Sequence, residues 1–138
     1  MTDQELLAKK LAFIETCVRE LESLAQPDRV ETDIRERRFV EHTLQIAIQA
    51  ALDIASHVVS DERLGEPRTN RELFDLLAAA GWLSPDLAAT MRRMVGFRNV
   101  VVHGYTAVDP AILRDVLEHH LGDLVEFVDS ARRRLAPP

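Results

Sequence analysis

Apolar residues recur at intervals of three and four positions through most of this chain, and this periodicity limits what the chain can fold into. The first run covers residues 3 to about 25, with its apolar positions at Leu6, Leu7, Leu11, Ile14, Val18, Leu21 and Leu24. Such spacing places apolar side chains on one face of an α-helix. No segment alternates apolar and polar residues as a half-buried strand does, and no internal repeat occurs. The pattern predicts an all-α protein.

Capping residues divide the periodic segments into five predicted helices. Thr69 and Glu72 have the spacing of a capping box before the third helix. Ser84-Pro85 and Asp109-Pro110 each combine an N-cap residue with a proline in the first turn, which starts the fourth and fifth helices. The predicted helices cover residues 3–25, about 32–59, about 70–80, 85–103 and 111–135. They predict an up-and-down bundle of four long helices and one short helix, with the largely apolar second helix at its centre.

Length and charge restrict the functional classes. A chain of 138 residues suits one domain, residues 1–138. Its net charge of −6 opposes an extended nucleic-acid surface but allows a local basic site. Cys17 is the only cysteine, which excludes an intrachain disulfide, and we expect it in the core. The N-terminus does not have the pattern of a secretion signal, and no run of about 18 apolar residues occurs. We therefore expect a cytoplasmic protein without a membrane span.

Arg98 occupies an unexpected position on the fourth helix. At 100° per residue it falls near the centre of an apolar arc formed by Met91, Met94, Val95, Val101 and Val102. An unpaired guanidinium on a buried face is costly. Arg98 therefore needs either a carboxylate partner or a wet, functional cleft.

The other side of the same helix carries a stripe of Arg92, Gly96, Asn99 and His103. Gly96 lets another backbone approach closely. Arg98 and His103 are about 140° apart on a straight helix, so within one chain they converge only if the helix ends or bends near His103. A two-fold dimer is the other solution. Because residues 87–108 contain no carboxylate, we expect phosphate to bind there, with Arg92 and Arg93 as further contacts.

The second helix carries a polar stripe of Arg38, His42, Gln45, Gln49 and Asp53. Such a stripe is usually the solvated face of a helix. Alternatively, Glu41 or Asp53 reaches Arg98 or His103 across the bundle. The sequence leaves both interpretations open.

The segment FRNVVVHGY carries a family resemblance. Arg98, His103 and Tyr105 match the Arg-x4-His-x-Tyr motif of HepT-like toxins in the HEPN superfamily. The stretches EHTLQIAIQAALDIASHVV, RTNRELFDLLAAAGWLSPDLAATMRRMVGFRN and VDPAILRDVLEHHLGDLVEF resemble the corresponding helices of that family. The resemblance runs from about Arg38 to Val128 and leaves the first helix and the basic tail, residues 132–134, unmatched.

The resemblance implies a HEPN-like helical fold and a homodimeric, metal-independent endoribonuclease without a cofactor, the toxin of a type VII toxin–antitoxin system. Arg98 and His103 correspond to catalytic residues. Tyr105 corresponds to the tyrosine that a partner, a minimal nucleotidyltransferase antitoxin, adenylylates. Asn99 matches the polar residue that often follows the arginine. Glu41 and Asp53 resemble supporting positions on the second helix, without an assigned chemical role.

These residue types suit metal-free cleavage of RNA, with tRNA among the candidate substrates. The RNA 2′-hydroxyl attacks phosphorus and leaves a 2′,3′-cyclic phosphate. Histidine can act as base or acid near neutral pH, and arginine supplies a permanent cation for phosphate oxygens. The alternative is a noncatalytic HEPN-type subunit that holds substrate or partner for a nucleotidyltransferase, with Arg98 as a structural ion-pair residue.

Overall fold

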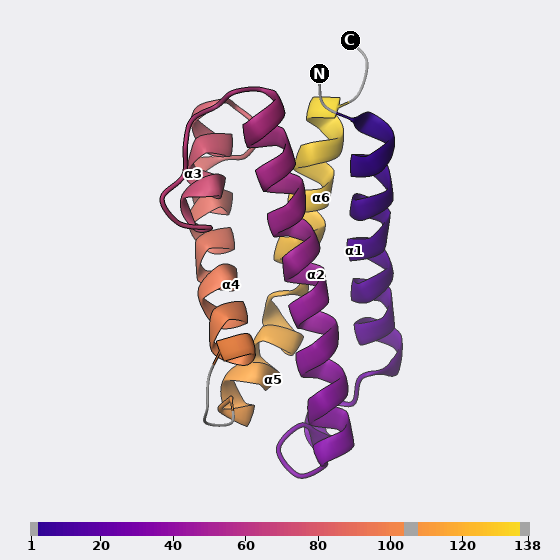
Figure 1. The fold of residues 1–138 in the computed structure, drawn as a ribbon. Helices are drawn as coiled ribbons and strands as arrows, with labels where there is room; N and C mark the ends of the chain where they lie inside the picture. The colour runs from indigo at the N-terminus through magenta and orange to yellow at the C-terminus, as the bar shows by residue number, and fades with distance from the viewer. Residues whose placement is uncertain (1–2, 104–107, 136–138) are drawn as a thin grey trace.

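The computed structural model describes residues 3–103 and 108–135; the side chains of residues 102 and 103 also lie outside the description. Within these ranges the chain is helical and has no strand (Figure 1). The elements are α1 (Gln4–Leu24), η1 (Pro27–Arg29, a 3₁₀ turn), α2 (Ile34–Asp61), α3 (Glu72–Ala79), α4 (Pro85–His103), α5 (Pro110–His119) and α6 (Leu121–Leu135). The predicted all-α class is confirmed.

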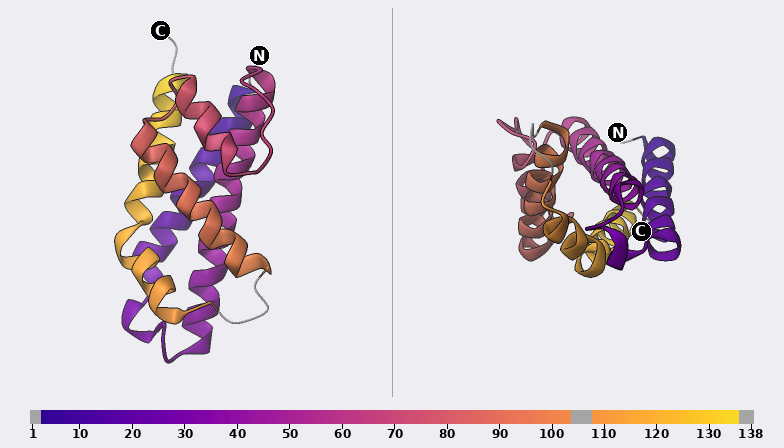
Figure 2. Two further views of the ribbon diagram at one scale, coloured as in Figure 1. Left: turned by 90° about the vertical axis from the view of Figure 1, so that its left-hand side faces the viewer. Right: turned by 90° about the horizontal axis from the view of Figure 1, so that it is seen from below.

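The long helices surround one extended apolar core. α2 packs against α1, α3 and α4, and α6 packs against both α1 and α4 (Figure 2). The largest fully buried side chains are Phe74, Phe127, Leu7, Leu11, Ile14, Leu21, Leu44, Ile48, Ile54, Met91, Leu113 and Leu124. Phe74 and Phe127 meet edge to face, with ring centroids 5.9 Å apart. None of the described helices is both long and apolar enough to cross a bilayer.

A second, smaller apolar cluster lies at the end of the bundle where α4 finishes. Its buried members are Leu21, Val30, Val40, Leu44, Val108, Leu113 and Leu117. Phe97 of α4 and Leu121 of α6 pack against this cluster and against the main core. The small cluster therefore joins α5 to the ends of α1 and α2.

The predicted fifth helix is wrong in one respect, because the chain divides it into α5 and α6. His120 leaves the helical conformation, with φ −123° and ψ 2°. Its ring lies between two carboxylates: Nδ1 is 2.9 Å from Asp123 and Nε2 is 3.4 Å from Asp115. The break lets α5 pack against η1 and α2 while α6 packs against α1 and α4. In Figure 1, α5 lies obliquely across the end of the bundle below α6.

Most helix starts follow the expected capping chemistry. The side chains of Asp3, Asp33, Ser84 and Asp109 each accept a hydrogen bond from a backbone N–H of the first turn. The capping box at α3 is an exception. α3 begins at Glu72, and the Glu72 carboxylate accepts from the backbone N–H of Arg68 at 2.7 Å. The preceding loop folds back onto Glu72, so the predicted box with Thr69 is wrong.

Candidate active site

Arg98 is half-buried on α4 and is held by neutral groups. Its Nη2 donates a short hydrogen bond to the Gln49 side-chain oxygen on α2. Its Nη1 donates to the side-chain oxygen of Asn99 at 3.2 Å. Among the described residues no carboxylate forms an ion pair with Arg98, and its buried Nε has no hydrogen-bond partner. The described residues therefore hold the guanidinium in place without neutralising its charge.

Gln49 belongs to a polar chain that crosses three helices. Its Nε2 donates to Asp53 Oδ1 at 2.9 Å, one turn further along α2. The other Asp53 oxygen lies 3.5 Å from Lys10 Nζ on α1. Figure 1 shows α4, α2 and α1 side by side in this order. Asp53 thus reaches Arg98 indirectly, through the Gln49 amide.

The other polar residues of α2 do not join this chain of contacts to Arg98. Arg38 and His42 are exposed, as expected for a solvated face. Glu41 is half-buried and has no hydrogen-bond or ion-pair partner in the described part of the chain, so there it does not reach Arg98. Neither Glu41 nor Asp53 contacts Arg98 in the described residues, and the stripe residue that does is Gln49.

Two of the motif residues lie at or beyond the limit of the description. The structure describes α4 as far as His103, so the helix end or bend expected near this residue lies outside the described residues. The side chain of His103 and the whole of Tyr105 lie outside the described residues. Asn99 is half-buried beside Arg98 and binds its guanidinium.

Arg92 and Arg93, both expected to contact phosphate, are exposed on α4 and have different partners. Arg92 is exposed, with Nη1 3.3 Å from an Asp75 oxygen on α3. Arg93 donates to Thr90 Oγ1 at 3.2 Å and lines a cavity of about 270 Å³ near the α5–α6 break. Arg92 therefore has a carboxylate partner, whereas Arg93 hydrogen-bonds a neutral hydroxyl.

Arg71 occupies the space that Gly96 leaves on α4. A Cβ atom at Gly96 would lie 3.1 Å from Arg71 Nη2, so a guanidinium approaches here rather than the predicted backbone. Arg71 is exposed and has no hydrogen bond or ion pair among the described residues. No sequence pattern links Arg71 to Gly96, because only the packing of α3 on α4 brings them together.

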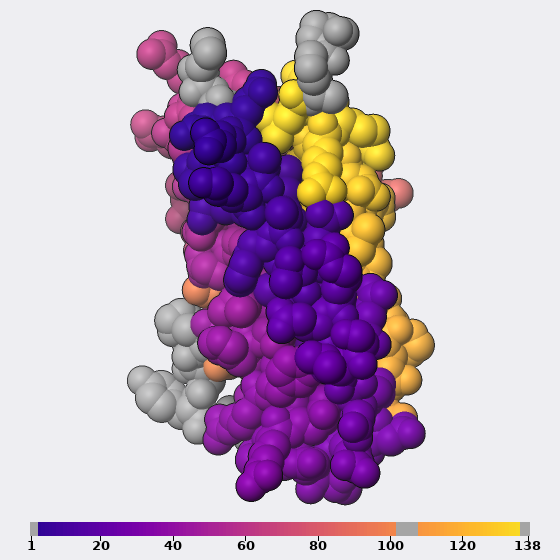
Figure 3. All heavy atoms as spheres, turned by 90° about the vertical axis from the view of Figure 1, so that its right-hand side faces the viewer, coloured from indigo at the N-terminus to yellow at the C-terminus, as the bar shows by residue number. Residues whose placement is uncertain are grey.

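An open groove lies between α1 and α2 beside the Gln49 network. It has a volume of about 380 Å³ and is lined by Leu6, Lys9, Lys10, Phe13, Gln45, Ile46, Gln49, Ala50 and Asp53. Figure 3 shows the α1 side of the molecule, with α2 on one side and α6 on the other. Among the described residues, no three His, Cys, Asp or Glu side chains gather closely enough to hold a metal ion.

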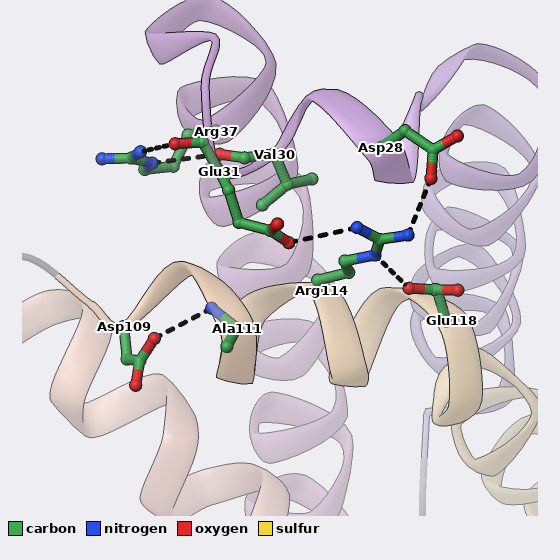
Figure 4. A network of polar contacts seen from close by, with 8 residues as sticks. All are labelled: Asp28, Val30, Glu31, Arg37, Asp109, Ala111, Arg114 and Glu118. Atoms are coloured by element: carbon green, nitrogen blue, oxygen red, sulfur yellow. Dashed lines mark hydrogen bonds and ion pairs between the residues drawn. The ribbon is translucent and has the colours of Figure 1, made fainter.

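Arg114 fixes α5 beneath the end of the bundle. It contacts Asp28 at 2.7 Å, Glu31 at 3.3 Å and Glu118 at 2.5 Å (Figure 4). The hydrogen bond to Glu118, followed by that to Glu31, raises the pKa of Arg114. Figure 4 also shows Asp109 capping α5 at Ala111. The chain that follows the motif segment is therefore anchored to η1 and the loop before α2.

Comparison with known proteins places this arrangement in a family. The chain matches the Ribonuclease HepT-like family over residues 14–131. It is 30% identical over 126 residues to the mRNA nuclease HepT of Shewanella oneidensis, covering 91% of this chain and 95% of that protein. It is 32% identical over 109 residues to the tRNA nuclease HepT of Aphanizomenon flos-aquae, covering 79% and 71%.

A solved structure has the same fold. It is that of the tri-AMPylated Shewanella oneidensis HEPN toxin in complex with MNT antitoxin. The TM-score is 0.87 at 30% identity, and the match covers 96% of this chain and 99% of that one. The HEPN-like fold and the endoribonuclease class that the motif indicated are confirmed. This chain belongs to the Ribonuclease HepT-like family.

Proposed function

We propose that this protein is the toxin of a toxin–antitoxin pair and cleaves RNA without a metal, with Arg98 and His103 as catalytic residues. The main support is the environment of Arg98, which neutral amides hold on the motif helix. Arg98 has no ion pair with a carboxylate in the described residues, so its charge can serve a phosphate. The protein acts as a homodimer of a single domain, residues 1–138.

In the proposed reaction a base removes the proton of the RNA 2′-hydroxyl, and the oxygen attacks the adjacent phosphorus. A bond from phosphorus to O2′ forms while the bond to O5′ breaks. An acid donates a proton to O5′, which gives a 2′,3′-cyclic phosphate and a free 5′-hydroxyl. Arg98 stabilises the added negative charge on the phosphate oxygens. His103 supplies base or acid, and two copies in a dimer supply both.

The proposed regulation involves Tyr105 and a nucleotidyltransferase antitoxin. The similar Shewanella oneidensis toxin is AMPylated and bound to an MNT antitoxin. In this protein the Tyr105 oxygen attacks the α-phosphorus of ATP, and pyrophosphate leaves. The attached AMP adds bulk and negative charge near the motif arginine, so it competes with the RNA phosphate for Arg98.

The test is cleavage of end-labelled cellular RNA, tRNA included, by purified unmodified protein in excess EDTA. We expect wild type to produce cyclic-phosphate ends, while Arg98→Ala and His103→Ala leave the RNA intact. Arg19→Ala is the control, because exposed Arg19 lies on α1 and its guanidinium hydrogen-bonds only Thr16 among the described residues. If wild type leaves all RNA intact while mass spectrometry shows Tyr105 unmodified, the nuclease proposal fails and a noncatalytic binding subunit replaces it.

A further inference from the structure

We propose that Gln49 is a positioning residue for Arg98 and that Asp53 fixes the orientation of the Gln49 amide. This inference rests on the proposed function, in which Arg98 binds the reacting phosphate. It adds a residue of α2 that lies outside the Arg-x4-His-x-Tyr motif. Three contacts join Lys10, Asp53, Gln49 and Arg98 into one chain.

The two ends of the Gln49 amide have different neighbours. Its oxygen can only accept, and it faces Arg98 Nη2; its nitrogen can only donate, and it lies 2.9 Å from Asp53 Oδ1. A flipped amide would face N–H groups toward the guanidinium and an oxygen toward the carboxylate. Both contacts would then be lost, so Asp53 favours the orientation in which Gln49 accepts from Arg98.

A neutral residue at position 49 has a specific consequence for the arginine. A carboxylate there would form a charge-assisted pair with the guanidinium, which is roughly twice as strong as a neutral hydrogen bond. Such a pair would compete with an RNA phosphate for the same donors. The amide restricts the position of Arg98 but leaves its positive charge in place. Asp53 lies one hydrogen bond further away and acts on Arg98 through Gln49.

The outer end of this chain lies on α1. Lys10 pairs with Asp53 at 3.5 Å, with side-chain exposures of 33% and 44%. Partly exposed pairs of this kind contribute little energy, so we expect Lys10 to have the smallest effect of the three residues. Lys10 also precedes residue 14, where the family match begins. The inner pair, Gln49 and Asp53, therefore carries the positioning effect.

The test measures single-turnover cleavage of one defined RNA at increasing RNA concentration, in EDTA, with the full unmodified protein. We expect Gln49→Leu to lower the maximal rate constant by up to about 10²-fold, because small misplacements of a catalytic group have effects of this size. The RNA concentration at half-maximal rate should change by less than about threefold, since uniform binding is retained. Gln45→Leu is the matched control, because Gln45 lines the same groove one turn earlier and does not contact Arg98.

Two further variants separate positioning from a structural role. In an Arg98→Lys background, which keeps a cation at this position, Gln49→Leu should lower the rate by a smaller factor than in wild type, because its effect passes through the Arg98 guanidinium. Gln49→Glu keeps an acceptor for Arg98 but loses the N–H that Asp53 accepts, and it should also slow cleavage by neutralising the guanidinium. This variant tests the proposal even if thermal melting shows that Gln49→Leu does not fold.

The possible failures are distinguishable. If Arg98→Ala is inactive while Gln49→Leu or Gln49→Glu cleaves at the wild-type rate, the positioning role is wrong and the proposed function stands. If Gln49→Leu lowers the rate by the same factor in wild type and in the Arg98→Lys background, Gln49 does not act through the Arg98 guanidinium and the inference is overturned. If Arg98→Ala itself cleaves like wild type, the proposed function fails at its central residue.

Discussion

Two arginines of this protein have opposite surroundings. Arg114 contacts the carboxylates of Asp28, Glu31 and Glu118. Arg98, which is half-buried, has amide partners, Gln49 and Asn99. The carboxylates around Arg114 form ion pairs with it, and these pairs hold α5 in place. The amides around Arg98 hold its side chain while leaving the charge for a ligand, which is the property that a phosphate-binding residue requires.

Cys17 shows how burial changes the chemistry of a single side chain. It is 1% exposed, which confirms the expectation that this lone cysteine lies in the core, and burial raises the pKa of its thiol to about 11. Because the thiolate is the reactive form, we expect the folded protein to react with a thiol-specific disulfide reagent at pH 8 far more slowly than the protein unfolded in urea. Equal rates in the two states would contradict the buried position.

The raised pKa of Cys17 also determines how its contribution to the free energy of unfolding changes with pH. The ordinary pKa of the thiol is 9.0, so the unfolded chain loses this proton first as the pH rises. The contribution of Cys17 to the free energy of unfolding is therefore complete below about pH 9 and decreases as the pH approaches 11.

Sequence reasoning identified Arg98 but not its partners. The position of Arg98 on an apolar face requires compensation, and periodicity alone shows this. Which group provides it depends on how α2 crosses α4, and no local pattern encodes that crossing. Gln49 is one member of the polar stripe among several, and the alternative interpretation of that stripe names the carboxylates Glu41 and Asp53 rather than Gln49 as partners. The contact between Arg71 and Gly96 was missed for the same reason.

At the scale of helices, proline and capping residues gave reliable starts. Ser84-Pro85 and Asp109-Pro110 begin α4 and α5 as expected. The break at His120 was missed because no proline marks it and the nearby Gly122 lies within the first turn of α6. The break coincides with contacts from His120 to Asp115 and Asp123, which lie five positions before it and three after it. The break is needed because α5 and α6 pack against different helices, and only the structure shows this packing.

Gly96 offers a test of packing on α4. We expect Gly96→Ala to raise the free energy of unfolding by about 0.5–1 kcal/mol, because alanine is favoured over glycine inside a helix. The new Cβ would lie 3.1 Å from the Arg71 guanidinium, an exposed side-chain end that can move aside. Urea unfolding measures the change. Gly81→Ala is the contrast and should destabilise, since Gly81 has φ +83°. Destabilisation by Gly96→Ala would mean that Arg71 is fixed in place.

At the scale of the whole molecule, α1 is joined to α6 by one ion pair at the surface. Arg132 contacts both carboxylate oxygens of Glu15, at 2.8 and 2.5 Å. The hydrogen bond from Arg132 lowers the pKa of Glu15. The tail arginine that matched no family feature therefore connects the first and last helices.

The pH dependence of this pair follows from the direction of that shift. A lowered pKa in the folded state stabilises the protein above the ordinary value of 4.5, and this contribution is lost as the pH falls through the folded-state pKa. We expect Glu15→Gln to cost less than about 1 kcal/mol at pH 7. The difference from wild type should shrink at pH 3 in urea unfolding. An equal difference at both pH values would show that the charge of Glu15 is not responsible.

The division of the interior into two apolar clusters affects how the bundle can open. The small cluster, which includes Val108, Leu113 and Leu117, holds the end where α4 finishes. It communicates with the main core through Phe97 and Leu121. Local opening of a protein tends to follow such cooperative units. Phe97 immediately precedes Arg98, so a fluctuation that loosens the seven buried residues of the small cluster can reach the main core through the neighbour of the proposed catalytic arginine.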